Sequence, residues 1–435
     1  MKAQAPEASA VATGAWLPIA LLVFTGTIAN ASGPRHALLV GLLFYALYLL
    51  ARGRLSLGST WPWCLPWCVV VLVSALWSWR PVTTLVDGLW EVFGPLAAGL
   101  LAASITPYIP ARRFPWPFIA LAAACALAFV GAANEHLGLG LAGPGILLKA
   151  YPGRGVASTL GTLAVLIAFW MLFASPDRTQ AYRMHWRITA VVLLCSGLAL
   201  GLLGHNRMFW FALAAGLLPW SVRLAASSLR LRIFSVALFF SVGAFGILYS
   251  SVFMKSEGNI GIEQATTVLQ QKYASDPRWV IWTAWSNVIA ERPWSGYGYG
   301  SRILPRIGEQ KIPPEIEDAV HARHHAHNVF LNALVQTGFI GLVAFLILLI
   351  GMFAALLRAY RLAPQAEQRW AAVGAASLLL AALAKSLTDD FFWGPANIVM
   401  WTFMGVLIGL LRVPATDVSS PCRQEEANAH GTGNS

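Results

Sequence analysis

Long apolar stretches, separated by shorter polar segments, make up most of the chain. A transmembrane helix needs about 20 predominantly apolar residues to cross a hydrocarbon core of about 30 Å. Twelve stretches approach or exceed that length, centred on residues 16–31, 36–51, 61–79, 83–104, 115–134, 157–175, 187–203, 207–222, 233–253, 329–357, 370–388 and 395–412. The pattern predicts an all-α polytopic membrane protein with about 12 transmembrane helices, and it excludes a soluble globular protein.

The composition agrees with this class, because 57% of the residues are hydrophobic and 11% are charged. The first stretch ends in the sequence IANAS, which resembles a signal-peptide cleavage site, but eleven more apolar stretches follow it. We therefore expect it to be retained as the first helix. The five cysteines have no spacing typical of a zinc site or of a disulfide framework.

The basic residues predict the orientation in the membrane. If the N-terminus is cytoplasmic, the segments on the inner side carry sixteen Lys and Arg residues, whereas the short outer loops carry five. Residues 1–253 then contain transmembrane helices 1–9, residues 328–412 contain helices 10–12, and residues 413–435 form a polar cytoplasmic tail. Residues 254–327 become one long periplasmic loop. Membrane topology therefore explains the net charge of +11 better than nucleic-acid binding does.

Ionisable residues within the predicted spans all lie toward the outer face in this topology. They are Asp87, Glu91, Glu135, Arg207, Lys385, Asp389 and Asp390. Such residues are costly in a membrane and mark functional cavities. A transporter or flippase of lipid-linked sugars is the alternative from another class, but it would place charges near the midplane and show paired, interrupted helices.

The predicted loop has short helices of its own. Asp276 as a cap and Pro277 at the first position predict a helix of about four turns, which Pro293 ends. The tryptophans of this helix favour a position in the interfacial aromatic belt. The guanidinium group of Arg278 is suited to hold a phosphate by two parallel hydrogen bonds.

A glycine-rich run from Ser295 to Arg302 follows this helix. It lacks the strand and helix that flank a nucleotide-phosphate loop. We expect a tight turn that brings Tyr297 or Tyr299 near a substrate.

Four histidines, His321, His324, His325 and His327, crowd together immediately before the tenth stretch. A continuous helix from residue 328 to 357 would be about 45 Å long, so its first turns should stand above the bilayer or it should bend at residues 337–341. His327 would then lie at the top of this helix, over an outer cavity. The positive end of the helix dipole favours neutral imidazole, which can accept a proton. Metal binding and a purely structural cluster are the alternatives.

The spacing after this histidine is also informative. Eleven residues, or about three helical turns, separate His327 from Gly338, so both should share one face, and Gly341 follows a turn later. Glycines there would let a neighbouring helix or a lipid chain come close.

The segment HNVFLNALVQTGFIG resembles the signature of the O-antigen ligase and O-antigen polymerase superfamily: His, then Asn, Ser or Gln, nine residues, and Gly-x-x-Gly. His327, Asn328, Gly338 and Gly341 occupy its positions. The segment DPRWVIWTAWSNVIAERPWSGYGYG and the twelve spans with one large periplasmic loop are similar to the family as well. The resemblance implies a GT-C-like fold in the inner membrane of a Gram-negative bacterium, with the active site facing the periplasm.

Members of this family take glycan from undecaprenyl diphosphate. Ligases pass it to the lipid A core, polymerases pass it to another lipid-linked repeat, and relatives pass it to protein hydroxyls. The resemblance thus implies a lipid-linked donor, a lipid A core acceptor, surrounding inner-membrane lipids, and no nucleic-acid partner or cofactor. The polar tail after the last stretch favours a ligase, because protein-glycosylating relatives usually carry further periplasmic sequence there. An O-antigen polymerase and a protein O-oligosaccharyltransferase are the alternatives, since the sequence does not fix the acceptor.

Transfer from a sugar diphosphate requires a group that stabilises the leaving phosphates and a group that takes the proton of the acceptor. We expect a metal-independent, inverting transfer in which Arg154, Arg207 and Arg278 bind the diphosphate and His327 is the base. Asn206 stands where the family often has a small hydroxyl residue before Arg207. The expected supporting residues are His325, Asn328, Gly338, Gly341, Lys385, Asp389 and Tyr297.

Overall fold

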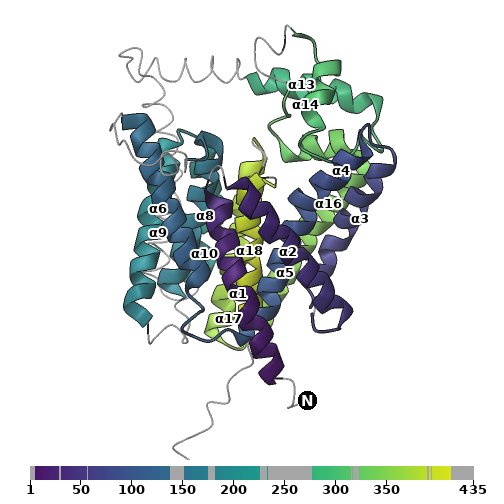
Figure 1. The fold of residues 1–435 in the computed structure, drawn as a ribbon. Helices are drawn as coiled ribbons and strands as arrows, with labels where there is room; N and C mark the ends of the chain where they lie inside the picture. Colours follow the sequence, from purple (N-terminus) through teal and green to yellow (C-terminus); the bar gives the residue numbers. More distant parts are fainter. Residues whose placement is uncertain are drawn as a thin grey trace, which may run out of the picture.

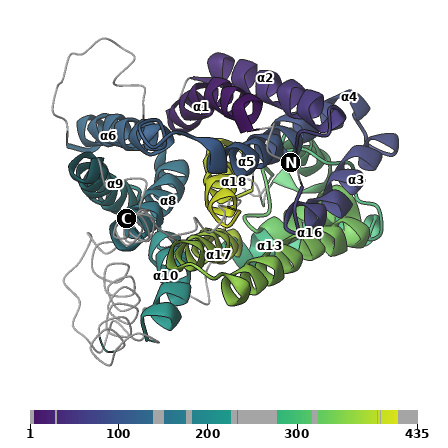
Figure 2. The same ribbon diagram turned by 90° about the horizontal axis from the view of Figure 1, so that it is seen from below.

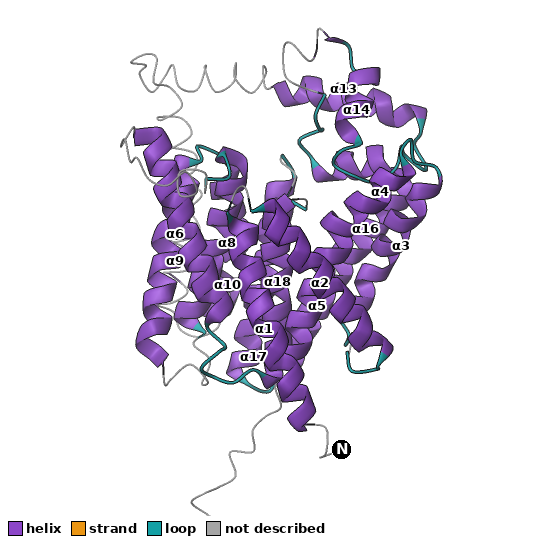
Figure 3. Ribbon diagram, viewed as in Figure 1, coloured by secondary structure: helices purple, strands orange, loops and turns teal. Residues whose placement is uncertain are grey.

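A computed structural model of the protein describes residues 5–28, 31–55, 57–137, 151–174, 182–225, 233, 277–314, 316, 323–388, 391–392 and 394–412. In these residues every regular element is a helix, and none is a strand (Figure 3). The predicted all-helical fold is therefore confirmed for the described part of the chain.

The helices follow one another in the order α1 (Ala5–Thr27), α2 (Ser32–Ala51), η1 (Trp61–Cys64), α3 (Leu65–Val73), η2 (Ser74–Leu76), α4 (Pro81–Gly88), η3 (Leu89–Phe93), α5 (Gly94–Ile105), η4 (Thr106–Tyr108), α6 (Trp116–Leu137), α8 (Arg154–Phe173), α9 (Arg183–Leu203), α10 (Met208–Ala225), α13 (Pro277–Glu291), α14 (Leu304–Lys311), α16 (Val329–Leu362), α17 (Ala366–Ser386) and α18 (Gly394–Leu410).

Eleven of the twelve apolar stretches coincide with helices in the described residues, and the ninth, 233–253, lies almost entirely outside them. Helical segments long and apolar enough to cross a membrane are Ser32–Ala51, Pro81–Tyr108, Trp116–Glu135, Gly155–Phe173, Arg183–Leu203 and Val329–Leu362. Shorter apolar helices are Gly14–Thr27, Trp61–Leu76, Met208–Ser221 and Gly394–Leu410. The polytopic membrane class follows from these segments, while the total of twelve spans and the domain boundaries stay predictions.

The helices pack into one bundle in which α6, α8, α9 and α10 group on one side, with α17 and α18 near the centre (Figure 2). Small residues allow the closest crossings. Gly99 of α5 faces Gly405 of α18, and a Cβ atom on either would overlap the backbone of the other helix. Helices in a membrane associate through such close backbone contacts, because lipid gives them no hydrophobic drive.

The helices α13 and α14 lie beyond one end of the bundle, and the N-terminus lies at the opposite end (Figure 1). They share a small core of their own, in which Trp285 is fully buried beside Ile307 and Val335. The indole of Trp282 donates a hydrogen bond to the carbonyl oxygen of Ala326 at 3.0 Å. The expectation that the tryptophans place this helix in the interfacial belt is therefore wrong for Trp285, which packs α13 onto the loop and onto α16.

The predicted helix after Pro277 is confirmed as α13, a helix of 15 residues, and its proposed cap Asp276 lies outside the described residues. The predicted bend in α16 is also confirmed. Gly338 interrupts the helix with φ 65° and ψ −167°. The freed N–H of Phe339 donates to the carbonyl of Pro293 at 2.8 Å, so the loop after α13 crosses α16 at the break.

Candidate functional site

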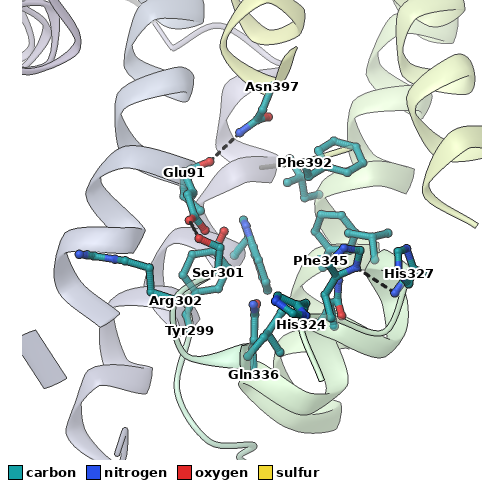
Figure 4. A pocket seen from close by; sticks show the side chains of 18 of the residues that line it. Glu91, Tyr299, Ser301, Arg302, His324, His327, Gln336, Phe345, Phe392 and Asn397 are labelled. Carbon is teal, nitrogen blue, oxygen red and sulfur yellow. Dashed lines mark hydrogen bonds between the residues drawn. The ribbon is translucent and has the colours of Figure 1, made fainter. Parts of the chain in front are cut away.

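A cavity of about 560 Å³ opens where the loop meets η3, α16 and α18 (Figure 4). Its polar lining residues are Glu91, Ser301, Arg302, His324, His325, His327, Asn332, Gln336 and Asn397. Its aromatic lining residues are Trp67, Tyr299, Phe345, Phe392 and Trp401. A mostly apolar cavity of this size with a few convergent polar groups is typical of a binding site.

The prediction that His327 lies over a cavity at the top of its helix is confirmed. His327 has φ 51°, in the left-handed region that few non-glycine residues adopt. Its backbone N–H donates to Nδ1 of His325 at 3.1 Å, and the N–H of Ala326 donates to Oδ1 of Asn332 at 2.9 Å. These bonds hold the turn in its strained conformation, which is common at functional sites. His324 lines the same cavity, and His321 lies outside the described residues.

Asn328 does not line the cavity but fixes the start of α16. Its Oδ1 atom accepts the N–H groups of Phe330 at 2.9 Å and Leu331 at 3.2 Å, as a helix N-cap does. Its Nδ2 atom donates to the carbonyl of Leu387 at 3.0 Å, just after α17. Asn328 thus ties the histidine turn to the end of α17.

Gly338 and Gly341 lie outside the cavity lining. His327 precedes α16 with a left-handed φ of 51°, and Gly338 leaves the helical conformation with φ 65°, so the expectation that His327 and these glycines share one helix face is wrong. A Cβ atom at Gly338 would overlap the carbonyl of Trp294, and one at Gly341 would overlap the Thr337 side chain. The close approach at Gly338 is therefore made by the loop backbone and not by a neighbouring helix or a lipid chain.

Of the two tyrosines in the glycine run, Tyr299 lines the cavity and Tyr297 does not. Tyr297 is buried, and its hydroxyl donates to Oε2 of Glu291 at 2.9 Å. Burial, followed by this hydrogen bond, raises the pKa of Tyr297 to about 12. The hydrogen bond from Lys311, followed by the one from Tyr297, lowers the pKa of Glu291. Tyr297 therefore anchors the loop and has no contact with the cavity.

The glycine run carries two residues that the sequence alone did not single out. Gly300 has φ 138°, and a Cβ atom there would overlap the carboxylate of Asp87. This close approach lets the next residue, Ser301, donate a hydrogen bond to Oε1 of Glu91. Arg302 Nε donates to Oδ1 of Asp87 at 2.6 Å, and its backbone N–H donates to Oδ2 at 3.1 Å. Asp87 and Glu91, the two ionisable residues of the fourth predicted span, thus accept the hydrogen bonds of the glycine run.

Three of the predicted cationic residues lie at the ends of another group of helices. Arg154 is the first residue of α8 and Arg207 immediately precedes α10, while Lys385 lies in the last turn of α17, and these three helices pack together. Lys385 is 1% exposed, and its Nζ donates to Oγ of Ser158 at 2.7 Å. The Arg154 side chain and Asp389 lie outside the described residues.

Two of the three predicted phosphate-binding arginines, Arg207 and Arg278, do not line the cavity, and the side chain of the third, Arg154, lies outside the described residues. Arg278 is half-buried in the first turn of α13. Oδ1 of Asn206 accepts the N–H of Met208 at 2.9 Å, so this residue caps α10 as a small hydroxyl side chain would. Within the described residues, no three His, Cys, Asp or Glu side chains converge as a metal site.

Two comparisons with known proteins bear on this geometry. The family model described as O-antigen ligase matches residues 154–346, which include Arg207, Arg278, His327 and the two glycines of the motif. The chain is also 22% identical over 209 residues to a protein named general O-oligosaccharyltransferase from Acinetobacter baylyi. That alignment covers 46% of this chain and 35% of the relative, so the chain spans about a third of that protein's length. Both comparisons confirm that the chain resembles the O-antigen ligase superfamily, and they extend the resemblance well beyond the histidine motif.

Proposed function

We propose that the protein transfers O-antigen glycan from undecaprenyl diphosphate to a hydroxyl of the lipid A core, at the periplasmic face of the inner membrane. The observation that carries this proposal is the histidine turn in the cavity wall directly before α16, within the region that matches the O-antigen ligase family. A cavity with imidazole side chains and other hydrogen-bonding groups is suited to activate a hydroxyl.

In the proposed reaction His327 is the general base. The acceptor oxygen attacks the anomeric carbon while the bond from that carbon to the diphosphate breaks, and the hydroxyl proton passes to the imidazole. A single direct displacement inverts the configuration at the anomeric carbon. His325 and Asn328 hold the turn that presents His327, through the hydrogen bonds at 3.1 Å to His325 and at 2.9 Å from Phe330.

The leaving diphosphate requires cations, and we assign this role to Arg154, Arg207 and Arg278. Arginine forms two parallel hydrogen bonds to a phosphate, which gives stronger and more directed binding than a point charge. Two hydrogen bonds connect the histidine turn with this cationic group. Asn328 bonds to Leu387 at 3.0 Å, just after α17, and Lys385 in the last turn of α17 bonds to Ser158 at 2.7 Å. Ser158 lies one turn along α8 from Arg154. In this proposal the lipid-linked donor lies between the histidine turn and the cationic group. The arginines stabilise the charge of the leaving diphosphate, as a metal ion does in other glycosyltransferases.

Protein O-glycosylation is a second candidate function, because the family resemblance implies it as an alternative and the relative from Acinetobacter baylyi is named a general O-oligosaccharyltransferase. It would use the same donor chemistry and a protein hydroxyl as the acceptor. The two candidates therefore differ in the acceptor and share the roles of His327 and the arginines.

The test is glycan transfer by the purified full chain, with undecaprenyl-diphosphate glycan as donor and EDTA present. Parallel reactions offer a lipid A core, a serine-rich acceptor protein and a second lipid-linked repeat. We expect the lipid A core to be glycosylated with EDTA present. Transfer only to the protein would establish the second candidate, and transfer to none of the three acceptors would overturn both. Loss of transfer with EDTA would overturn the metal-independent mechanism.

A further inference from the structure

One wall of the cavity presents two hydrogen-bond acceptors side by side. Glu91 belongs to η3 and Asn397 belongs to α18 (Figure 4). Nδ2 of Asn397 donates to the backbone carbonyl of Glu91 at 2.7 Å. The Glu91 carbonyl can accept a hydrogen bond only from the NH₂ end of an amide. This contact therefore fixes the orientation of the Asn397 amide, with Nδ2 toward that carbonyl.

The Oδ1 atom of Asn397 is buried and finds no donor in the described part of the chain. Asn397 itself is 1% exposed and lines the cavity. Buried polar atoms in native proteins are paired in the large majority of cases, and an unpaired one calls for an explanation. A ligand in the cavity that donates a hydrogen bond is such an explanation.

Glu91 lines the cavity as well, and its Oε1 atom accepts the Ser301 hydroxyl. An ionised carboxylate accepts hydrogen bonds and donates none. Glu91 lies in a π-helical segment of the candidate membrane span Pro81–Tyr108, which also contains Asp87. Acids in such spans and π-helical turns both concentrate at functional sites.

The charge of this wall indicates what binds there. A carboxylate and an amide oxygen attract hydroxyl groups and repel a diphosphate. Arg302 also lines the cavity, but it forms an ion pair with the buried Asp87 at 2.5 Å, so its charge is already matched. The aromatic rings of Trp67, Tyr299 and Phe345 line the same space and offer flat apolar surfaces to a sugar ring.

We propose that Glu91 and Asn397 form a hydroxyl-binding subsite that holds the acceptor sugar. This inference rests on the proposed function and adds to it the part of the site that selects the acceptor. In Figure 4, Glu91 and Asn397 lie on one side of the pocket and His327 on the other. A sugar bound by the first two residues spans the cavity and presents another hydroxyl to the imidazole. The donor diphosphate stays outside this subsite.

The test compares the wild-type protein with Glu91→Gln, which keeps the shape of the side chain and an acceptor for Ser301 but removes the charge. Two quantities are measured: binding of lipid A core glycolipid without donor, and the KM values for acceptor and donor during transfer. We expect acceptor binding and acceptor KM to weaken by about 10-fold or more, as for loss of a hydrogen bond to a charged group. The donor KM should stay within about 2-fold, which a general structural defect would not produce.

Glu309→Gln is the matched control, because Glu309 is an exposed carboxylate on α14 outside the cavity. An equal acceptor affinity in wild type and Glu91→Gln overturns the subsite and leaves the proposed function standing. An equal loss in Glu309→Gln also overturns it. A wild-type protein that binds the glycolipid in a Glu91-dependent way without transferring glycan overturns the proposed function and supports the subsite.

A second variant covers the case in which Glu91→Gln does not fold. Ser301→Cys places a thiol beside Glu91, and its alkylation by a maleimide is compared with that of the wild-type protein, whose Cys195 is exposed. Lipid A core glycolipid should slow this alkylation several-fold, whereas a phospholipid without sugar should not. An unchanged alkylation rate with glycolipid overturns the subsite.

Discussion

Nδ1 of His325 accepts the backbone N–H of His327 at 3.1 Å, and the two imidazole rings lie 3.9 Å apart between centroids. An imidazole nitrogen accepts a hydrogen bond only through its lone pair, so His325 in this arrangement does not carry a proton on Nδ1. Two imidazolium ions at this distance would also repel each other. The turn therefore favours a pair in which at least one histidine is neutral.

The first prediction is that His327→Ala lowers the rate of glycan transfer by about 10² to 10⁴, the usual cost of removing a general base. Donor binding and the melting temperature should change little, because the side chain faces a cavity. The measurement is single-turnover transfer by the purified protein. His324→Ala is the comparison within the same lining and should cost far less. Near-normal transfer by His327→Ala would leave the cluster with a structural role only.

The second prediction concerns pH. A general base works in its deprotonated form, so the transfer rate should rise between about pH 6 and pH 8 if His327 is the base. If a protonated His327 assists the leaving phosphate instead, the rate should fall over this interval. The profile is measured with saturating donor and acceptor. The small residual rate of His327→Ala should show no such step, and a step that survives this substitution would assign the titration to another group.

The third prediction is that Arg207→Lys and Arg278→Lys impair transfer almost as strongly as the alanine variants. One ammonium group does not reproduce two directed hydrogen bonds to a phosphate. The donor KM and the maximal rate are measured for both series. Arg306→Lys, on the exposed side of α14, serves as the control. Lysine variants with close to wild-type rates would show that both arginines act through their charge alone and not through two directed hydrogen bonds.

The hydrophobic pattern predicts much of this fold for a simple reason. A helix in an apolar medium must satisfy its backbone internally, so long apolar stretches become helices with little dependence on their neighbours. The length of the tenth stretch predicted that this helix either stands above the bilayer or bends at residues 337–341, and the structure has the bend at Gly338. The place of His327 at the start of that helix followed in turn.

The rest of the site depends on contacts between distant residues, which periodicity does not report. Arg302 and Asp87 are 215 positions apart, and Ser301 and Glu91 are 210 positions apart. These two pairs form only because the backbone of the glycine run packs against α4, and no local sequence pattern predicts that contact. Trp285 shows the same limit, because a tryptophan on a loop helix suits a membrane interface or a small core equally well by composition.

The fourth prediction is that α13 faces the periplasm. The sixteen-to-five bias of basic residues predicts it, and α13 lies at the end of the bundle opposite the N-terminus. Trp279 is 63% exposed, so Trp279→Cys should react with a membrane-impermeant thiol reagent in spheroplasts. Arg52→Cys, at the exposed end of α2, should react only after the membrane is permeabilised. The reverse pattern would place every proposed substrate group on the wrong side of the membrane.

The last prediction separates the fold of the motif from its chemistry. Gly338→Ala should destabilise the protein by about 2 kcal/mol or more, because φ 65° disfavours any side chain and the new Cβ atom would overlap the carbonyl of Trp294. Gly41→Ala is the matched control. Gly41 lies in α2, and a Cβ atom added there would meet no other atom within 4 Å, so the change should be neutral or slightly stabilising.

The measurement is the melting temperature in detergent together with the yield of folded protein. A stable Gly338→Ala protein that lacks only transfer activity would mean that the glycine contacts substrate, contrary to its place outside the cavity lining. A loss of stability together with activity would instead support the arrangement described above. In that case the glycine of the motif acts through the loop: it lets residues 293–295 cross α16, and so carries Ser301 and Arg302 to the wall that faces His327.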